Sequence, residues 1–418
     1  MCALKAVVAI KDDLVKFTQK IVRLPSVPGE EGEVAMVVLA KLQEFECDEA
    51  WIDGIGNVIG VLRGQGRGPN VLLNGHLDVV PAGRVENWRY DPFGAEIDEE
   101  GNIRGRGTAD MKGGLAALVF TMKLMKDLRD QGVELPGDVI FSAVVFEEAA
   151  EMFGMEYLCK TSLPDKGLIF DVCYLAEPTN GRVNLGQRGK VEIVVTTRGR
   201  TAHSSRPWRG VNALEKMLPV LDRIFNKMGR ELPSHPDLGQ CSITVTNLVC
   251  RPGALSVVPD ECEISIDRRY APGETLDSIV AEFEALFEEI KKKDPKFEAI
   301  ARVRTFLERS YTGYEKEVQK HHPMWIIERD HPFVQRTLHA LKRVGQEVDV
   351  GYFAGGVDGG LTAGLMGIPT IGYSRADENL AHTSEEYIPI KTLVETAEGF
   401  AAILCELFDI DITELNGA

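Results

Sequence analysis

Two stretches of alternating helical and strand-like segments, 1–185 and 308–418, flank a central block with a different pattern. In the flanking stretches, apolar residues at helical spacing alternate with short runs that are apolar on both faces, such as 139–146. Runs of this kind are typical of strands buried between layers of helices. The pattern predicts an α/β fold, a mixed, mostly parallel sheet with helices on both faces.

The central block, 186–307, is predicted to be an inserted domain. Its segments follow the order strand, helix, strand, strand, helix, strand, at 190–197, 211–228, 242–249, 261–267, 276–291 and 297–306. This βαββαβ order is typical of a ferredoxin-like α+β domain with an antiparallel sheet. Because 418 residues exceed one ordinary core, we expect 1–185 and 308–418 to form one discontinuous domain beside the insert.

Acidic residues outnumber basic ones by 64 to 47, which gives a net charge of −17. This balance argues against nucleic acid or an anionic membrane as a partner. No apolar window approaches the length of a transmembrane helix, and the N-terminus lacks the long apolar core of a signal peptide. The eight cysteines, scattered without CxxC pairs, favour free thiols in a reducing compartment and therefore a cytoplasmic protein.

Side chains that bind metal ions recur where strand-like runs end. The set comprises His76, Asp78, Asp110, Glu147, Glu148, Glu177 and His382. Each alone is more often structural, but the carboxyl ends of strands in an open α/β sheet line one crevice, so their joint placement favours a shared site. Imidazole and carboxylate donors suit zinc, cobalt or manganese. A carboxylate beyond those needed for ligation suits proton transfer in metal-assisted hydrolysis.

Asp78 follows His76 by two residues, so the two side chains point to the same side of an extended backbone. This spacing predicts that the Asp78 carboxylate accepts a hydrogen bond from the second ring nitrogen of His76, which fixes the tautomer of the imidazole. We favour this supporting role for Asp78 over direct ligation.

Six segments resemble the M20 family of di-zinc hydrolases, and are most similar to the branch of acetylornithine deacetylase and succinyl-diaminopimelate desuccinylase. In chain order they are GHLDVVPAG, NWRYDPFGA, GRGTADMKGG, FEEAAEMFG, AEPT and AHTSEE. The resemblance covers essentially the whole chain, including the insert. It implies a lid and dimerisation role for 186–307, a homodimer, and two divalent metal ions per subunit, zinc with cobalt or manganese as alternatives.

The resemblance also implies roles within the set of candidate ligands. Asp110 would bridge both ions, His76 and Glu177 would complete one site, and Glu148 and His382 would complete the other. Glu147 matches the general base that takes a proton from the bridging water and passes it to the leaving nitrogen. Glutamate rather than aspartate at position 177 favours deacylases and carboxypeptidases over aminopeptidases.

In the insert, the resemblance implies contacts with the substrate. His203, in TAHSSRPWRG, matches a histidine that stabilises the oxyanion and, in dimeric relatives, reaches the active site of the partner subunit; a turn or helix-capping role is the alternative. Arg269, in EISIDRRY, matches an arginine that binds a substrate carboxylate, and its neighbour Arg268 would face the other side of the strand. Asn247 would add polar contacts or lie in a turn.

The glycine-rich run AGGVDGG, 354–360, which includes Gly356, resembles the segment that lines the substrate cavity of the family. It lacks the Lys-Ser/Thr ending of a phosphate-binding loop. The nearby stretch HHPMWIIERDHP, 321–332, carries His321 and His322. We expect a solvent-exposed loop or cavity rim there rather than a source of metal ligands.

These observations predict a metal-dependent amidohydrolase that removes an acyl group from an N-acyl amino acid. A dipeptidase or carboxypeptidase of the same family breaks the same kind of bond and stays open as the alternative. A non-catalytic homologue that binds an amino-acid derivative is disfavoured, because Glu147 and the ligand set are complete. The expected partners are a small N-acyl amino acid or dipeptide and a second copy of the chain.

Overall fold

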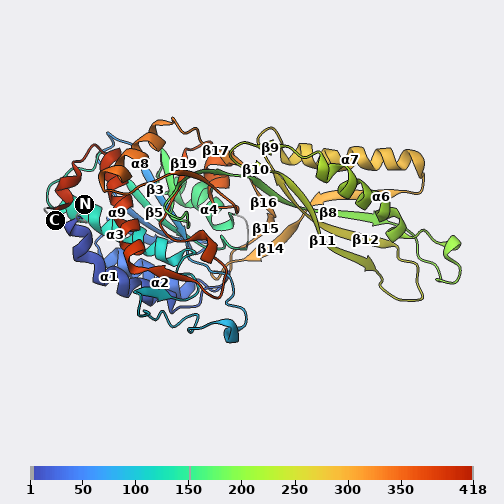
Figure 1. The fold of residues 1–418 in the computed structure, drawn as a ribbon, viewed down its shortest axis with the longest axis horizontal. Coiled ribbons are helices and arrows are strands. Elements are labelled where there is room, and N and C mark those ends of the chain that lie inside the picture. The colour runs from blue at the N-terminus through green and yellow to red at the C-terminus, as the bar shows by residue number, and fades with distance from the viewer. Residues whose placement is uncertain (1–3, 150–151, 417–418) are drawn as a thin grey trace. The chain divides into compact units, whose positions relative to one another are not determined.

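The computed structural model describes residues 4–149 and 152–416, which form two compact units (Figure 1). The first unit comprises Met1–Gly186, Leu307–Lys316 and Ile326–Ala418, and the second comprises Gln187–Phe306 and Glu317–Trp325. The last of these segments, expected in the outer domain, groups with the insert. The reason is that its strand β16 (His321–His322) pairs with β8 (Gly189–Arg198) of the second unit.

Nine strands of the described chain form one mixed sheet in the order β1-β2-β5-β3-β6-β19-β7-β17, with β18 also paired to β7. Their bounds are β1 Glu49–Ile52, β2 Val58–Leu62, β3 Val71–His76, β5 Val139–Val144, β6 Val172–Leu175, β7 Val183–Gln187, β17 Trp325–Ile326, β18 Val350–Phe353 and β19 Thr370–Tyr373. The pairs in the centre, β5–β3, β3–β6 and β6–β19, are parallel, and β1, β2 and β7 add antiparallel pairs. The predicted mixed α/β sheet is confirmed.

Helices cover both faces of this sheet. On one face, α3 (Lys112–Asp130) packs against β3 and β5, and Tyr174 of β6 hydrogen-bonds Thr337 of α8 (Pro332–Arg343) at 2.7 Å. Neighbouring Cys173 points to the other face, where its thiol hydrogen-bonds Thr362 of a π-helical segment. The remaining helices of this unit are α1 Lys5–Val22, α2 Gly32–Glu44, α4 Phe153–Tyr157, α5 Leu163–Asp165 and α9 Ile390–Leu407.

The second unit has the predicted ferredoxin-like order. Its elements are β8, α6 Ala213–Asn226, β11 Ser242–Arg251, β12 Glu261–Tyr270, α7 Leu276–Lys293 and β13 Glu298–Val303. The strands lie in the order β11-β12-β8-β13, and all three pairs are antiparallel. Alternate side chains of the sheet, such as Ile193 and Ile264, pack with Met217 of α6 and Phe283 of α7 in one buried core.

Several short strands complete the structure, and one divides an expected element. The predicted strand 297–306 is split, since β13 ends at Val303 and a separate strand, β14 (Thr305–Arg309), follows. The short pairs are β4 Asn102–Arg104 with β20 Tyr387–Pro389, β9 Ser234–His235 with β10 Gly239–Gln240, and β14 Thr305–Arg309 with β15 Glu315–Gln319.

The structure bears on the expectations of free thiols and of no membrane-spanning helix. The seven cysteines among the described residues are free, and five of them are buried, whereas Cys2 lies outside those residues. None of the helices in 4–149 and 152–416 has the length and apolar character needed to cross a membrane.

The expectation of an exposed loop at His321 and His322 is wrong. Both residues lie in β16, His322 is only 6% exposed, and Trp325 just beyond is 3% exposed. His321 Nε2 lies 2.7 Å from the hydroxyl oxygen of Tyr270. The backbone of the two histidines can be buried here because its polar groups are satisfied by pairing with β8.

Acidification is expected to weaken the second unit through these histidines. Burial lowers the pKa of His321 to about 4 and that of His322 to about 3. In the unfolded chain both imidazoles take up protons near pH 6.5, so the unfolded state binds more protons and stability falls as the pH drops from 6.5 towards 4. Each histidine contributes a slope of at most about 1.4 kcal/mol per pH unit.

Chemical unfolding of wild type and His322→Leu between pH 7 and 4 measures this effect. The variant should show the flatter dependence of the free energy of unfolding on pH. His339→Leu, at a position whose side chain is 61% exposed, provides the control. Equal slopes for wild type and His322→Leu would contradict the prediction.

Candidate metal centre

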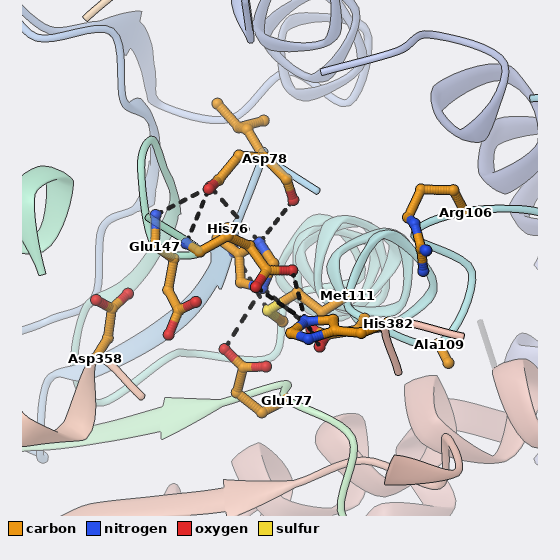
Figure 2. A network of polar contacts seen from close by, with 12 residues as sticks. His76, Asp78, Arg106, Ala109, Met111, Glu147, Glu177, Asp358 and His382 are labelled. Carbon is orange, nitrogen blue, oxygen red and sulfur yellow. Dashed lines mark hydrogen bonds and ion pairs between the residues drawn. The ribbon is translucent and has the colours of Figure 1, made fainter. Parts of the chain in front are cut away.

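His76 and His382, the two histidines of the predicted site, lie close together (Figure 2), and Asp110 is within 3.3 Å of each. Its Oδ1 is 3.3 Å from Nε2 of His76, and its Oδ2 is 3.3 Å from Nε2 of His382. One carboxylate therefore faces two imidazoles, one with each oxygen. This is the geometry that a ligand shared between two neighbouring cations needs.

The remaining candidates surround this core. Oε2 of Glu148 lies 3.0 Å from Nε2 of His382, and Oε1 of Glu177 lies 3.7 Å from Nε2 of His76. Two sets offer donor atoms that all lie within 4.8 Å of one another; they are His76, Asp110 and Glu148, and His76, Glu147 and Glu177. The structure thus brings together all five predicted ligands and the predicted base.

The topology of the sheet explains this convergence. His76 ends β3, Glu147 and Glu148 follow β5, and Glu177 follows β6. These three strands are parallel neighbours, so their carboxyl ends meet at one edge of the sheet. Asp110 comes just before α3, and His382 lies in the loop between β19 and β20 with a φ of 64°.

The electrostatics of the cluster favour positive charge between the carboxylates. Contacts with Asp110 and then Glu148 raise the pKa of His382 to about 10. Burial acts to lower the pKa of His76, but the carboxylates around it, Glu177 first, hold that pKa well above its usual value. Burial and then the charge of Glu177 raise the pKa of Glu147 well above the usual range. A divalent cation would supply the same compensating charge.

The prediction that the Asp78 carboxylate accepts the hydrogen bond from His76 is wrong. Nδ1 of His76 lies 2.9 Å from the backbone carbonyl oxygen of Asp78, whereas Oδ1 of Asp78 is 3.7 Å away. The carboxylate instead accepts the backbone N–H groups of Glu147, at 3.1 Å, and Glu148, at 2.9 Å (Figure 2). Asp78 therefore positions three residues of the site. Its backbone carbonyl orients the imidazole of His76, and its carboxylate holds the backbone of Glu147 and Glu148.

Glu386 supports Asp110, a contact that the sequence did not reveal. Its Oε1 accepts the backbone N–H groups of Ala109, at 2.9 Å, and of Asp110, at 3.1 Å. Its other oxygen pairs with the buried guanidinium of Arg106, which lies over the ring of Trp88. Glu386 is the last acid of the AHTSEE segment, so its nearness to His382 in sequence was the available signal.

A cavity of about 320 Å³ opens onto the cluster within the first unit. It is lined by Asp110, Glu147, Glu148, Glu177 and His382 and by the glycine-rich run, including Gly356. The acid of that run, Asp358, is buried, and its Oδ2 accepts a hydrogen bond from Asn74 at 2.9 Å. As the one charged residue of AGGVDGG, Asp358 could have been noticed from the sequence.

The candidates in the second unit have distinct surroundings. His203 is exposed, and its Nδ1 accepts the backbone N–H of Ser205 at 3.1 Å, so the expected turn contact is present. Arg268 is only 1% exposed and pairs with Glu274, whereas Arg269 is 24% exposed and pairs with Asp267 at 2.8 Å. Arg269 is therefore the more accessible of the two arginines.

Asn247 does not lie in a turn. It sits within β11 opposite Ser265, directly after a break in the strand register between Val245 and Asn247. Its side chain is exposed on the edge strand of the sheet. The turn alternative for Asn247 is therefore wrong.

Comparison with known proteins places this arrangement in a family. Residues 72–406 match the sequence profile of Peptidase family M20/M25/M40. The chain belongs to the M20 family. Its members hydrolyse amide bonds, so the expected class of reaction is confirmed along with the family resemblance.

Three relatives of this M20 chain differ in how much of it they cover. Uncharacterized protein YgeY of Escherichia coli K12 is 32% identical over 394 residues, 94% of this chain and 93% of the relative. The N-formyl-4-amino-5-aminomethyl-2-methylpyrimidine deformylase of Bacillus subtilis is 27% identical and covers 92% of each chain. Succinyl-diaminopimelate desuccinylase of Dinoroseobacter shibae is 28% identical over 64% of this chain and 71% of the relative.

Solved structures share the fold of this M20 chain. Aminopeptidase PepT of Bacillus cereus aligns with a TM-score of 0.71 at 21% identity, over 95% of this chain and 98% of that one. YxeP of Bacillus subtilis, a dinuclear metal binding peptidase, aligns with a TM-score of 0.70 at 15% identity, over 96% and 99%. At these identities the likeness concerns the fold.

Proposed function

We propose that this M20 hydrolase removes the acyl group from an N-acyl amino acid. The observation that carries the proposal is the placement of Asp110 between two imidazoles, with the buried carboxylate of Glu147 in the same donor cluster. Two relatives have names that describe removal of a small acyl group: the deformylase, which covers 92% of this chain, and the desuccinylase, which covers 64%. Glutamate at position 177 agrees with the deacylase side of the family.

The residues present fit two divalent cations. Asp110 would bridge them, with His76 and Glu177 on one cation and Glu148 and His382 on the other. Nitrogen and oxygen donors without cysteine suit zinc, cobalt or manganese, and zinc is our first choice. Such ions supply Lewis acidity, which polarises the amide carbonyl and lowers the pKa of water in the site.

Glu147 would move the proton. Its carboxylate takes a proton from the attacking water and delivers it to the nitrogen of the leaving amino acid, so that the C–N bond breaks without a free amide anion. Burial and neighbouring carboxylates raise its pKa, which favours the delivery step, while bound cations act in the opposite direction.

The second unit would contribute two substrate contacts. Because Nδ1 of His203 accepts the N–H of Ser205, a neutral imidazole carries its proton on Nε2, which can donate to a developing oxyanion. Arg269, accessible on its strand, would bind the carboxylate of the amino acid by exchanging Asp267 for the substrate. Asn247, exposed on the edge strand β11, would add a polar contact with the substrate.

A homodimer belongs to the proposal as well. On α6, Leu214, Leu218 and Phe225 share one face, and the last two are more than half exposed. The edge strand β11 of the same unit offers backbone groups to a further strand. Light scattering should give the mass of a dimer for wild type and that of a monomer for Leu218→Glu; a monomeric wild type would refute this part.

Free thiols support the proposed cytoplasmic location.

The experiment that tests the function is hydrolysis of a substrate panel after loading with zinc, cobalt or manganese, beside a chelated control. The panel contains N-formyl-, N-acetyl- and N-succinyl-amino acids and dipeptides. Metal-dependent release of an amino acid from one N-acyl class supports the proposal. Cleavage of dipeptides alone would replace it with the peptidase alternative, and metal binding without any turnover would replace it with a binding protein.

A further inference from the structure

Four consecutive backbone N–H groups after β5 are held by side chains rather than by the sheet. The N–H of Val145 donates to Oδ1 of Asn57 at 3.0 Å, and that of Phe146 donates to Oε1 of Glu31 at 3.3 Å. The next two, of Glu147 and Glu148, donate to Asp78. The three acceptor residues come from different segments of the chain. The turn that carries Glu147 is therefore held in place by side chains of other segments.

Glu31 is the least expected of these acceptors. It stands at the start of α2, 115 residues before Phe146, and its side chain is fully buried. Its second oxygen, Oε2, has no hydrogen-bond partner among the described residues. Burial, and then the charge of Asp78, raises the pKa of Glu31 to about 8. A buried carboxyl group with an unpartnered oxygen lowers the stability of the fold, because desolvation is offset only by hydrogen bonds or opposite charge.

The backbone at Phe146 explains why an acceptor is needed there. Phe146 has a φ of 59°, a left-handed conformation that is unfavourable for a bulky side chain. Successive N–H groups in such a turn converge and form a concave site for anionic oxygen atoms. Two buried carboxyl groups, Glu31 and Asp78, accept the N–H groups of this turn, and the Glu147 carboxylate belongs to the metal-binding cluster.

We propose that Glu31 is a positioning residue for Glu147, acting through the N–H of Phe146. The inference rests on the proposed function, in which Glu147 carries the proton. Without the acceptor, the turn loses one of the contacts that define it, and the carboxylate of Glu147 shifts relative to the reacting atoms. A misplacement of about 1 Å can cost on the order of 100-fold in rate.

The test compares Glu31→Met, which keeps the volume and removes the acceptor, with Glu31→Gln, which keeps an acceptor oxygen. Glu30→Met, at an exposed neighbouring position, is the matched control. We expect kcat of Glu31→Met to fall about 10- to 100-fold. Its KM and metal content should stay close to those of wild type. Glu31→Gln should restore most of kcat, and Glu30→Met should match wild type.

A second measurement does not depend on turnover. Hydrogen exchange of the amides at 145–148 should be faster in Glu31→Met than in wild type and should return towards wild type in Glu31→Gln. If wild type is inactive on the whole panel, the proposed function fails and this exchange still decides the role of Glu31. Unchanged kcat and exchange in Glu31→Met would overturn the inference. So would equal impairment of both variants, parallel loss of metal, or failure of Glu31→Met to fold.

Discussion

Replacing Glu147 with glutamine is expected to lower kcat by about 10²- to 10⁴-fold, the usual contribution of general acid–base catalysis, while the metal content stays unchanged. Glutamine fills the same volume but can neither take the proton from water nor deliver it to the leaving nitrogen. The Asp78 carboxylate accepts the backbone N–H of Glu147, a contact that the substitution leaves in place. Steady-state kinetics and metal analysis of the purified variant measure both quantities.

The adjacent residue provides the matched comparison. Glu148→Gln removes a carboxylate that lies 3.0 Å from His382, so this variant should lose metal as well as turnover. The pair therefore separates proton transfer from ligation at two consecutive positions of one turn. Turnover retained in Glu147→Gln would remove Glu147 as the base, and metal lost from it would make Glu147 a ligand instead.

Replacing Asp110 with asparagine is expected to have the largest effect on metal binding. Both carboxylate oxygens face imidazoles at 3.3 Å, so a neutral amide with one oxygen cannot serve two cations. Loss of a supporting residue typically costs 10- to 100-fold in metal affinity, and we expect loss of this bridging residue to cost at least about 100-fold. Turnover should fall with the metal content.

Competition with a chelator, followed by metal analysis, measures the affinity of Asp110→Asn. Asp12→Asn, at an exposed position of α1, is the control and should bind metal as wild type does. The fold should survive the substitution, because Glu386 accepts the backbone N–H of Asp110 rather than a side-chain group. Wild-type metal affinity in Asp110→Asn would contradict the bridging role.

Much of the candidate site was predictable because its residues stand at the ends of strands. His76, Glu147 and Glu177 follow runs whose apolar pattern is local and readable, and parallel strands bring their carboxyl ends to one edge. The βαββαβ order of the second unit was equally readable, since it depends on the sequence of elements. The specific ligand roles came from resemblance to a family and remain proposals for this chain.

The supporting contacts were not predictable in the same way. The spacing of His76 and Asp78 correctly placed them together, yet it could not show that the backbone carbonyl would take the imidazole and free the carboxylate for Glu147 and Glu148. Glu386 and Asp358 belong to motifs that the sequence analysis singled out. Their hydrogen-bond partners could not be predicted, because these partners come from distant parts of the chain. A polar stretch at His322 is buried for a similar reason: a distant strand pairs with it.

The sequence by itself determined the order of the main elements and the chemical types gathered at the metal cluster, because periodicity and motif are local properties of a chain. Only the tertiary structure decided which atoms meet. Glu31 reaches Phe146 across 115 residues, and Asp110 turns one oxygen to each histidine. Such contacts depend on how separate segments close around one another, and hydrogen bonds of this range leave no period or spacing in the sequence.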